Sequence, residues 1–150
     1  MRTRPKIAAA AVRTRLQEKG LKLTPQRYAI YEMLARSETH PTVDELYQAV
    51  KQVFPMLSLN TVYYTLSALK DAGLLAEAPV RHAPARFDAN MEIHHHLVCL
   101  GCGKLEDVYD ESLDRLTLRR KNARGYEIRS HRVEFRGYCG DCRNRKQTAV

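Results

Sequence analysis

Two pairs of cysteines constrain the fold of this chain more than any other feature. Cys99 and Cys102 form one CxxC motif, Cys139 and Cys142 form a second, and no cysteine is left over. Thiolates separated by two residues on a tight turn can point to the same side, so two such turns can supply a closed tetrahedral sulfur site for Zn²⁺. Two disulfides or four unconnected thiols are the alternatives, but a basic chain without a secretory signal favours the metal. We therefore predict a structural zinc site.

The 36 residues between the two motifs exceed the spacing of a compact zinc ribbon. We expect a helix near Ser112 to Ala123 and an alternating strand in "YEIRSHRVEFRGY" within this interval. The zinc site would then join the end of that strand to the turn after "HHLVC". Metal binding of this kind couples directly to folding, so chelation should loosen the second half of the chain.

The first half of the chain is predicted to be mostly helical. Thr24 can cap a helix in "LTPQRYAIYEMLARS", and Thr42 with Glu45 predicts a capping box for "HPTVDELYQAVKQVF". Ser58 can cap a third helix in "SLNTVYYTLSALKDAGLL", which Gly73 can close in the left-handed conformation.

Two short segments after the third helix, "LLAEAPV" and "ARFDA", can pair as strands across the turn from Arg81 to Pro84. Three helices followed by a hairpin predict a winged helix-turn-helix. The strands and helix beyond Ala89 predict a second, small domain. The fold class is therefore expected to be α+β, with a winged-helix DNA-binding domain over residues 1–86 and a metal-binding domain over residues 87–150.

The distribution of charge also points to nucleic acid. Residues 1–36 hold nine Lys or Arg against Glu18 and Glu32, so their net charge is 9 − 2 = +7, in a chain whose formal net charge is +8. A solvated basic face is the alternative, because charge alone does not identify a polyanion-binding protein. No apolar run approaches the roughly 20 residues that a membrane helix needs, so we expect a cytoplasmic protein with no membrane partner.

Three consecutive histidines lie beside the first CxxC motif. His94 and His96 would point to the same face of a strand, whereas His95 would point to the other. Asp107, in the "KLED" segment, can pair beside them across the cysteine turn. Two imidazoles with a carboxylate form a mixed nitrogen and oxygen site that suits Fe²⁺, Mn²⁺ or Zn²⁺. A chance run of surface histidines is the alternative.

Six motifs, in this order and spacing, make the chain resemble the ferric uptake regulator family of bacterial metal-dependent repressors. They are "GLKLTPQR", "HPTVDELY", "LSLNTVYYTLSALKDAGLL", "ARFD", "HHHLVCLGCGKLED" and "GYCGDC", and the likeness covers about residues 15 to 143. It implies a homodimer with an N-terminal winged helix that binds double-stranded operator DNA, and a C-terminal α+β dimerisation domain. It also implies that the four cysteines hold structural zinc.

The resemblance implies a regulatory metal site on five residues: His40, Asp88, His94, His96 and Asp107. His40 would lie in the DNA-binding half and Asp88 at the domain boundary, so one ion could fix the angle between the domains of each subunit. The distance between the two DNA-reading helices of a dimer would change with it. An ordinary residue before Pro41 and a solvated turn acid are the alternatives for His40 and Asp88.

The choice of acids at two of these positions resembles the peroxide-sensing (PerR) subgroup. Asp88 and Asp107 stand where iron sensors of the family usually carry glutamate. The implied chemistry is that hydrogen peroxide reacts at bound Fe²⁺ and oxidises a ligand histidine, either His40 or His94, which weakens metal binding and releases DNA. Bound Mn²⁺ would support repression that is insensitive to peroxide. An iron-responsive repressor of iron uptake is the alternative.

The third predicted helix is expected to enter the major groove of DNA. Its candidate base contacts are Asn60, Thr61, Tyr63, Tyr64 and Ser67. Tyr63 matches a tyrosine of the family, whereas Tyr64 departs from the arginine or asparagine that other members carry, and packing of both rings in the core is the alternative. The candidate phosphate contacts are Arg13, Lys19, Lys22 and Arg27.

Some members of the family carry a further metal site, which this chain matches only in part. His95, Asp114 and His131 lie near the relevant positions, but Ile93 stands where histidine is common.

Two other classes of function compete with a metal-dependent repressor. A metalloenzyme with His94, His96 and Asp107 as ligands would leave the basic helical half without a purpose, so we do not expect an enzyme. A zinc-stabilised DNA-binding or adaptor protein without a sensing function would give no role to His40, Asp88 or the pair His94 and His96.

Overall fold

The computed structural model describes residues 7–78, 80 and 83–147. The chain forms two compact units, which divide between Met91 and Glu92. The first unit is mainly helical and the second is built on a three-stranded sheet, so the predicted α+β fold class is confirmed. No helix in the described ranges has both the length and the apolar composition needed to cross a membrane.

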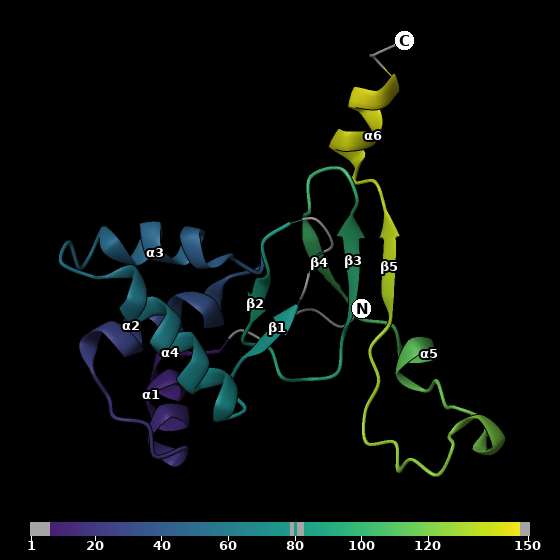
Figure 1. The fold of residues 1–150 in the computed structure, drawn as a ribbon, viewed down its shortest axis with the longest axis horizontal. Coiled ribbons are helices and arrows are strands. Elements are labelled where there is room, and N and C mark those ends of the chain that lie inside the picture. Colours follow the sequence, from purple (N-terminus) through teal and green to yellow (C-terminus); the bar gives the residue numbers. More distant parts are fainter. Residues whose placement is uncertain (1–6, 79, 81–82, 148–150) are drawn as a thin grey trace. The chain divides into compact units, whose positions relative to one another are not determined.

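The described part of the first unit contains four helices and a β-hairpin (Figure 1). The elements are α1 (Ala9–Glu18), α2 (Pro25–Arg36), α3 (Val43–Lys51), α4 (Leu59–Asp71), β1 (Ala76–Ala78) and β2 (Arg86–Asp88).

Hydrogen bonds at the helix ends confirm the predicted caps. The hydroxyl of Thr24 accepts a backbone N–H from the first turn of α2, and the hydroxyl of Ser58 accepts one from the first turn of α4. Thr42 Oγ1 accepts the N–H of Glu45 at 3.3 Å, and Glu45 Oε2 accepts the N–H of Thr42 at 2.8 Å, which completes the capping box of α3. Gly73 has a φ of 72° after the end of α4, the left-handed conformation predicted for it.

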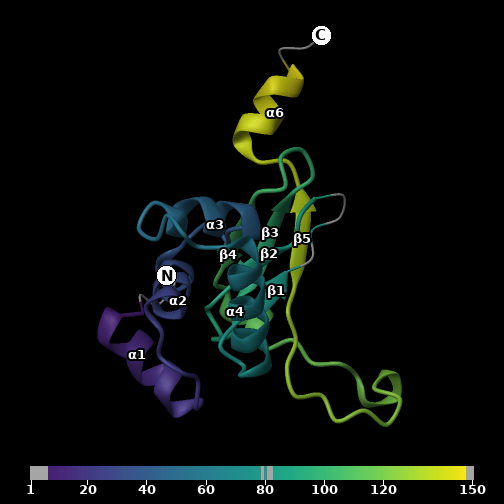
Figure 2. The same ribbon diagram turned by 60° about the vertical axis from the view of Figure 1, so that its left-hand side comes forward.

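Helix α2 packs against α1, α3 and α4, and it also contacts β2 (Figure 2). The buried residues of this core all belong to the first unit. They are Val12, Leu16, Ile30, Tyr31, Leu34, Ala35, Leu46, Val50, Leu57, Val62, Leu66, Leu69, Leu74, Leu75, Phe87 and Ala89. Burying each large aliphatic side chain contributes about 1.5–3 kcal/mol, so this core can support the helical unit without a metal ion.

The predicted hairpin is confirmed by the antiparallel pairing of β1 with β2, in which Ala76 lies opposite Asp88. The predicted turn includes residues 81–82, which lie outside the described residues. Helices α2 to α4 followed by this hairpin form a winged helix. Helix α1 precedes them and was not predicted. Its N-cap side chain makes no capping hydrogen bond and it buries only Val12 and Leu16, so the sequence carries a weak signal for it.

The second unit contains the sheet β4-β3-β5, formed by β3 (His95–Cys99), β4 (Leu105–Val108) and β5 (Glu134–Gly137). Strand β3 is antiparallel to β4 and parallel to β5. His96 lies opposite Asp107 in the β3–β4 register, which confirms the predicted pairing of the "KLED" strand beside the histidines.

The helix predicted from Ser112 to Ala123 is wrong in length. Helix α5 spans only Glu111–Asp114, and a 3-10 turn, η1 (Arg120–Asn122), follows after an irregular stretch. A continuous helix would place Arg115 four residues before Arg119, and like charges at this spacing destabilise a helix. A prediction based on apolar periodicity alone does not take this repulsion into account, so it gives a helix that is too long.

The strand predicted over "YEIRSHRVEFRGY" is also shorter than expected, because β5 spans only Glu134–Gly137. Its partner β3 has five residues, and no other strand of the described sheet lies beside residues 126–133. An alternating pattern without a partner strand therefore stays irregular. Helix α6 (Gly140–Gln147), which begins inside the second CxxC motif, was not predicted.

Candidate functional site

The four cysteines come together at one end of the sheet, as their spacing predicts. Their sulfur atoms all lie within 4.8 Å of one another, and the Sγ atoms of Cys102 and Cys139 are 3.8 Å apart. Four sulfurs at about 2.3 Å from a tetrahedral Zn²⁺ would lie about 3.8 Å from each other. All four are free thiols without disulfide bonds, so the arrangement suits a closed metal site.

Backbone hydrogen bonds fix the two cysteine turns. Cys99 ends β3 and donates its N–H to the carbonyl oxygen of Lys104 at 2.8 Å, which closes the first turn. The N–H of Cys139, after β5, donates to Cys99 Sγ at 3.3 Å. Gly101 is required for this approach, because a Cβ atom there would lie 2.8 Å from Cys142 Sγ and 3.0 Å from its Cβ. The strands and the short turn therefore bring the four thiols together.

Two of the thiols differ in their affinity for protons. The N–H of Cys139 stabilises the Cys99 thiolate and lowers the pKa of Cys99 to about 6, against the opposing effect of burial. Burial raises the pKa of Cys142 to about 12, and hydrogen bonds with the neighbouring thiols act in the same direction. A divalent cation would favour the thiolate form of both, and Cys142 must lose its proton for the cation to bind.

The second unit has few other sources of stability. Its buried hydrophobic residues in the described ranges are Val98, Cys99, Leu105 and Cys142, and two of these four are cysteines. Small domains with so little apolar burial generally need a metal, a disulfide or a partner subunit. The four-cysteine cluster is therefore suited to hold the sheet and α6 together.

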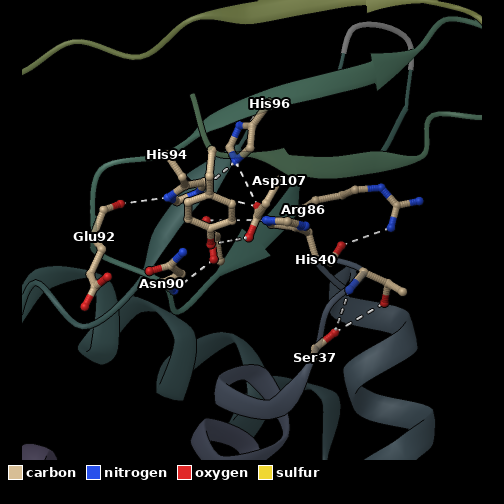
Figure 3. Close-up of polar contacts among 11 residues, drawn as sticks. Ser37, His40, Arg86, Asn90, Glu92, His94, His96 and Asp107 are labelled. Carbon is tan, nitrogen blue, oxygen red and sulfur yellow. Dashed lines mark hydrogen bonds and ion pairs between the residues drawn. The ribbon is translucent and has the colours of Figure 1, made fainter. Parts of the chain in front are cut away.

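A second cluster of ligand-type groups lies at the start of β3 and on β4. Figure 3 shows the side chains of His94, His96 and Asp107 pointing toward one another. The Nε2 atoms of the two histidines are 3.1 Å apart, and Asp107 Oδ1 lies 3.5 Å from His94 Nε2 and 3.8 Å from His96 Nε2. Donor atoms at about 2.1 Å from a shared ion lie roughly 3.0–3.5 Å apart, so the three atoms fit one face of a metal site.

Neighbouring groups orient these ligands. His94 Nδ1 lies 2.7 Å from the carbonyl oxygen of Glu92, to which only a protonated nitrogen can donate, so Nε2 keeps its lone pair. The hydroxyl of Tyr109 donates to Asp107 Oδ2 at 3.2 Å, and its ring centroid lies 5.9 Å from that of His94. One carboxylate oxygen is thus held by Tyr109 while the other faces the imidazoles. Sequence reasoning missed Tyr109, because no motif marks it.

The other two predicted regulatory residues meet inside the first unit. His40 Nε2 lies 3.4 Å from Asp88 Oδ2, and both side chains are fully buried. The N–H of Asn90 donates to Asp88 Oδ1 at 2.8 Å. Asp88 therefore repeats the pattern of Asp107, with one oxygen engaged by a hydrogen-bond donor and the other directed to an imidazole.

The backbone of His40 adopts an unusual conformation that β2 supports. Its φ is 51°, in the left-handed region that few non-glycine residues occupy. Arg86 Nη1 donates to the His40 carbonyl oxygen at 3.0 Å (Figure 3) and also lies 3.4 Å from Glu45 Oε2, which belongs to the capping box of α3. Arg86 of β2 thus contacts the strained residue directly, and Glu45 of α3 holds Arg86 in place. Arg86 is a further supporting residue that the sequence did not reveal.

His95 points away from His96, as the strand alternation predicts, and it forms a separate network. His95 Nδ1 accepts the N–H of Val133 at 3.0 Å, and its Nε2 lies 3.1 Å from Asp114 Oδ1. His131 stacks on the His95 ring and donates from Nε2 to the carbonyl oxygen of Leu113 at 2.6 Å. These residues do not form a third group of metal ligands in the described part of the chain. They link β3 to α5 and to the segment before β5.

Helix α4 presents a polar face to solvent opposite its buried face. Tyr63 and Tyr64 are 53% and 68% exposed, so neither ring packs in the core. Asn60 and Ser67 are exposed on the same face, and Thr61 is half-buried, with its hydroxyl 2.8 Å from that of Ser58. The side chains on this face are therefore available to a ligand in solution.

The four predicted phosphate contacts differ in exposure. Arg13, Lys19 and Lys22 are exposed, so they can reach a phosphate backbone without rearrangement. Arg27 is half-buried, and its Nη1 donates to the carbonyl oxygen of Lys22 at 2.7 Å. Arg27 therefore also ties the start of α2 to the loop that precedes it.

Comparisons with known proteins agree with this geometry. The profile of the ferric uptake regulator family matches residues 18–136. The peroxide-responsive repressor PerR of Staphylococcus saprophyticus is 38% identical over 132 residues, which cover 88% of this chain and 89% of that protein. The peroxide operon regulator of Bacillus subtilis is 38% identical over 127 residues, or 85% of this chain and 88% of that protein. The solved structure of the Campylobacter jejuni peroxide stress regulator is 29% identical, covers 89% of this chain and 97% of that chain, and has a TM-score of 0.62. The chain belongs to the ferric uptake regulator family.

Proposed function

We propose that the chain is a metal-dependent transcriptional repressor that binds double-stranded operator DNA as a homodimer and responds to peroxide. The exposed polar face of α4 supports DNA binding, and the two separate clusters of metal-ligand side chains support control by a metal. The names of the two peroxide regulators compared above support the response to peroxide. A regulator accounts for both units, whereas a metalloenzyme gives the exposed face of α4 no role.

We assign Cys99, Cys102, Cys139 and Cys142 to a structural Zn²⁺. Four thiolates leave no open position for a substrate or for water, so the ion would stabilise the fold and take no part in the response. The sparse apolar burial of the second unit supports this assignment. Cys99 ends β3 and Cys102 lies in the turn after it, whereas Cys139 follows β5 and Cys142 lies in the first turn of α6. The ion would therefore fix the positions of β3, β5 and α6.

We assign the regulatory Fe²⁺ or Mn²⁺ to His94, His96 and Asp107 together with His40 and Asp88. The observation that carries this proposal is the state of the two aspartates: each has one oxygen held by a hydrogen-bond donor and the other directed to an imidazole. Imidazole nitrogens with carboxylate oxygens suit Fe²⁺ and Mn²⁺, and they differ from the four thiolates of the other cluster.

Metal binding of this kind would couple the two units, because the five ligands are divided between them. His40 and Asp88 belong to the helical unit, and the other three ligands belong to the sheet unit. An ion that binds all five would restrict the orientation of α4 relative to the sheet unit. In a dimer, it would set the separation of the two α4 helices, and only one separation matches successive major grooves. Loss of the ion would release this restraint and lower operator affinity.

Peroxide would act through the imidazoles. An Fe²⁺ ion held by these residues would supply the electron that breaks the O–O bond of hydrogen peroxide. Overall, one peroxide oxygen would be added to a ligand imidazole and the other would leave as water. His40 and His94 are the candidates, and both are almost fully buried, so an oxidant from bulk solvent would reach them poorly. The hydrogen bond of His94 Nδ1 to the Glu92 carbonyl holds its Nε2 toward Asp107 and His96, where the oxidant would form. An oxidised imidazole would bind the metal weakly.

The sheet unit offers a surface for the second copy. Leu97, Phe135 and Tyr138 are 45%, 45% and 46% exposed, and they line a shallow groove on β3 and β5. Strand β5 lies at the edge of the described sheet, where a second strand can pair with it. An exposed apolar patch beside an unpaired edge is typical of a homodimer interface.

Operator binding with and without Mn²⁺ tests the metal-dependent function. Duplexes selected from a random pool by the Mn²⁺-loaded protein serve as the operator. We expect Mn²⁺ to tighten binding to them by tenfold or more, and His94→Ala to abolish this effect while the zinc content stays near one ion per chain. Equal affinity with and without Mn²⁺ for the wild-type protein would rule out metal control.

Mass spectrometry tests the response to peroxide. After treatment of the Fe²⁺-loaded protein with hydrogen peroxide, a peptide that contains His40 or His94 should gain one oxygen. The Mn²⁺-loaded protein should show no such gain, since Mn²⁺ does not drive this reaction readily. If neither peptide changes in the Fe²⁺ form while operator binding still depends on metal, the protein is an iron-responsive repressor of the same family.

A further inference from the structure

The strand that carries Asp88 also holds the loop that carries His40. Strand β2 consists of Arg86, Phe87 and Asp88, so the side chains of Arg86 and Asp88 lie on one face and that of Phe87 lies on the other. Phe87 packs in the core of the helical unit, and its N–H donates to the carbonyl oxygen of Pro41 at 3.0 Å. Arg86 donates to the carbonyl oxygen of His40, which directly precedes Pro41. Two successive carbonyl groups of the loop are therefore held by β2.

The backbone conformation of His40 is one that needs such support. A φ of 51° brings the Cβ atom of any residue other than glycine close to its own backbone, so this conformation costs free energy. Pro41 follows, and a residue before proline favours extended conformations with negative φ. The side chain of His40 is fully buried, so a change of its backbone conformation would carry the imidazole away from Asp88.

Arg86 contacts His40 through the backbone. Its Nη1 donates to the His40 carbonyl oxygen at 3.0 Å (Figure 3), and the direction of that carbonyl follows from the backbone dihedral angles of His40. The same Nη1 lies 3.4 Å from Glu45 Oε2, which also accepts the N–H of Thr42 at 2.8 Å. The Arg86 side chain is only 16% exposed, so water competes weakly for these contacts. The first turn of α3 thus fixes the guanidinium group that holds His40.

The charge of Arg86 would act in the opposite direction from this contact. A guanidinium group stays protonated, and its positive charge two residues from Asp88 repels a cation bound there. The carboxylate of Glu45 offsets only part of this charge. Removal of Arg86 would tighten metal binding if only the charge mattered, and would weaken it if the contact with His40 mattered more. A measurement of metal affinity therefore separates the two effects by their sign.

We propose that Arg86 is a positioning residue for the regulatory metal site and acts through the backbone of His40. This inference rests on the proposed function, which assigns His40 and Asp88 to that site. The hydrogen bond from Arg86 keeps His40 in the left-handed region, and this conformation places His40 Nε2 3.4 Å from Asp88 Oδ2. Strand β2 thus supplies one metal ligand and positions another.

A double-mutant cycle tests this role. The Mn²⁺ affinity of the zinc-loaded protein is measured without DNA for the wild type, Arg86→Met, His40→Ala and the double variant. Methionine keeps an unbranched apolar side chain and has no hydrogen-bond donor. We expect Arg86→Met to lower the Mn²⁺ affinity about tenfold, near the lower limit for loss of a contact that orients a metal ligand. In the His40→Ala background the same substitution should change the affinity by less than about twofold, because the residue through which Arg86 acts is already gone.

Two further variants are controls. Arg86→Lys keeps the charge and a hydrogen-bond donor, so its Mn²⁺ affinity should stay within about threefold of the wild type. Thr24→Ala removes the cap at the start of α2, whereas the His40 loop follows the end of that helix. It should lower the free energy of unfolding and leave the Mn²⁺ affinity within about twofold of the wild type.

A second route covers the case in which Arg86→Met does not fold. Glu45→Gln then takes its place in the cycle, because it removes the carboxylate that holds Arg86 in position. We expect it to lower the Mn²⁺ affinity about threefold, and this loss should also disappear in the His40→Ala background.

Three results would overturn the proposal. Equal losses from Arg86→Met in the wild-type and His40→Ala backgrounds would show that Arg86 acts independently of His40. Tighter Mn²⁺ binding by Arg86→Met would show that its charge outweighs its contact with the loop. An affinity of Arg86→Met within about twofold of the wild type would show that other contacts hold His40 in place.

The proposed function fails in a different experiment. Metal control is judged from operator affinities with and without Mn²⁺, whereas the cycle measures Mn²⁺ binding without DNA. If the wild-type protein binds its operator equally with and without Mn²⁺, the repressor proposal fails whatever the cycle shows. If metal control is present and the losses in the cycle are additive, only the role of Arg86 fails.

Discussion

Replacing Tyr109 with phenylalanine tests whether the regulatory site depends on residues that do not themselves bind metal. The substitution removes the hydrogen bond from the Tyr109 hydroxyl to Asp107 Oδ2 and keeps the aromatic ring beside His94. Asp107 could then rotate, and the oxygen that faces His94 and His96 would spend less time in position. We expect weaker Mn²⁺ binding with little change in the stability of the zinc-loaded protein.

The structure sets the size of the effect. Loss of an outer hydrogen bond to a metal ligand typically lowers metal affinity by 10–100-fold. The 3.2 Å bond is longer than the usual O–H···O range of about 2.5–3.0 Å, and Tyr109 is partly exposed, so water can replace some of the interaction. We therefore expect a loss near the lower limit, about tenfold in Mn²⁺ affinity, which corresponds to about 1.4 kcal/mol.

Titration of the zinc-loaded protein with Mn²⁺, followed through the electron paramagnetic resonance of the free ion, measures this affinity. Tyr126→Phe is a matched control, because Tyr126 is 76% exposed and makes no side-chain hydrogen bond within the described residues. Its Mn²⁺ affinity should equal that of the wild-type protein. An affinity of Tyr109→Phe within twofold of the wild type would refute the reasoning, since Asp107 would then be held by other contacts.

Three further outcomes are expected. Chelation of zinc should remove hydrogen-exchange protection from the amides of β3, β4 and β5. The amides of α2 and α4 should keep their protection, because the helical unit has its own core. Equal loss of protection in both units would contradict this expectation. Thr42→Ala should lower the free energy of unfolding by about 1 kcal/mol in urea denaturation, since it breaks the capping box of α3, and an unchanged midpoint would show that the cap contributes nothing. Tyr31→Phe should raise the free energy of unfolding by on the order of 1 kcal/mol, because the buried Tyr31 hydroxyl has no hydrogen-bond partner among the described residues. A clear loss of stability would mean that the hydroxyl forms a hydrogen bond in solution.

The sequence predicted those features that depend on a few neighbouring residues. Thr42 and Glu45 satisfy each other's backbone within one turn, so the start of α3 could be identified without any knowledge of the fold. The alternation of β3 likewise places His96 and His95 on opposite faces, and the structure confirms their separate environments. The convergence of the four cysteines followed from their CxxC spacing, because a turn of fixed length leaves the two thiols few other directions.

Local patterns failed where the result depends on distant partners. The segment from Ser112 to Ala123 was expected to be helical, yet apart from η1 it is irregular beyond Asp114, since its cations repel one another at helical spacing and no element of its own unit covers it. The length of β5 was set by β3, which offers only a short edge for pairing. The exposure of Tyr63 and Tyr64 could not be decided from the sequence either, because both faces of α4 carry apolar or aromatic residues.

By itself, the sequence determined which residues can act as ligands, caps and turns, because chemical type and short-range spacing are properties of the chain. Only the tertiary structure decided what surrounds those ligands: Arg86 reaches the carbonyl of His40 across 46 positions, and the ring of Tyr109 lies beside that of His94, which precedes β3. Contacts of this kind depend on how strands and helices pack. No local pattern encodes that packing, so the residues that orient a site become visible only when the fold is known.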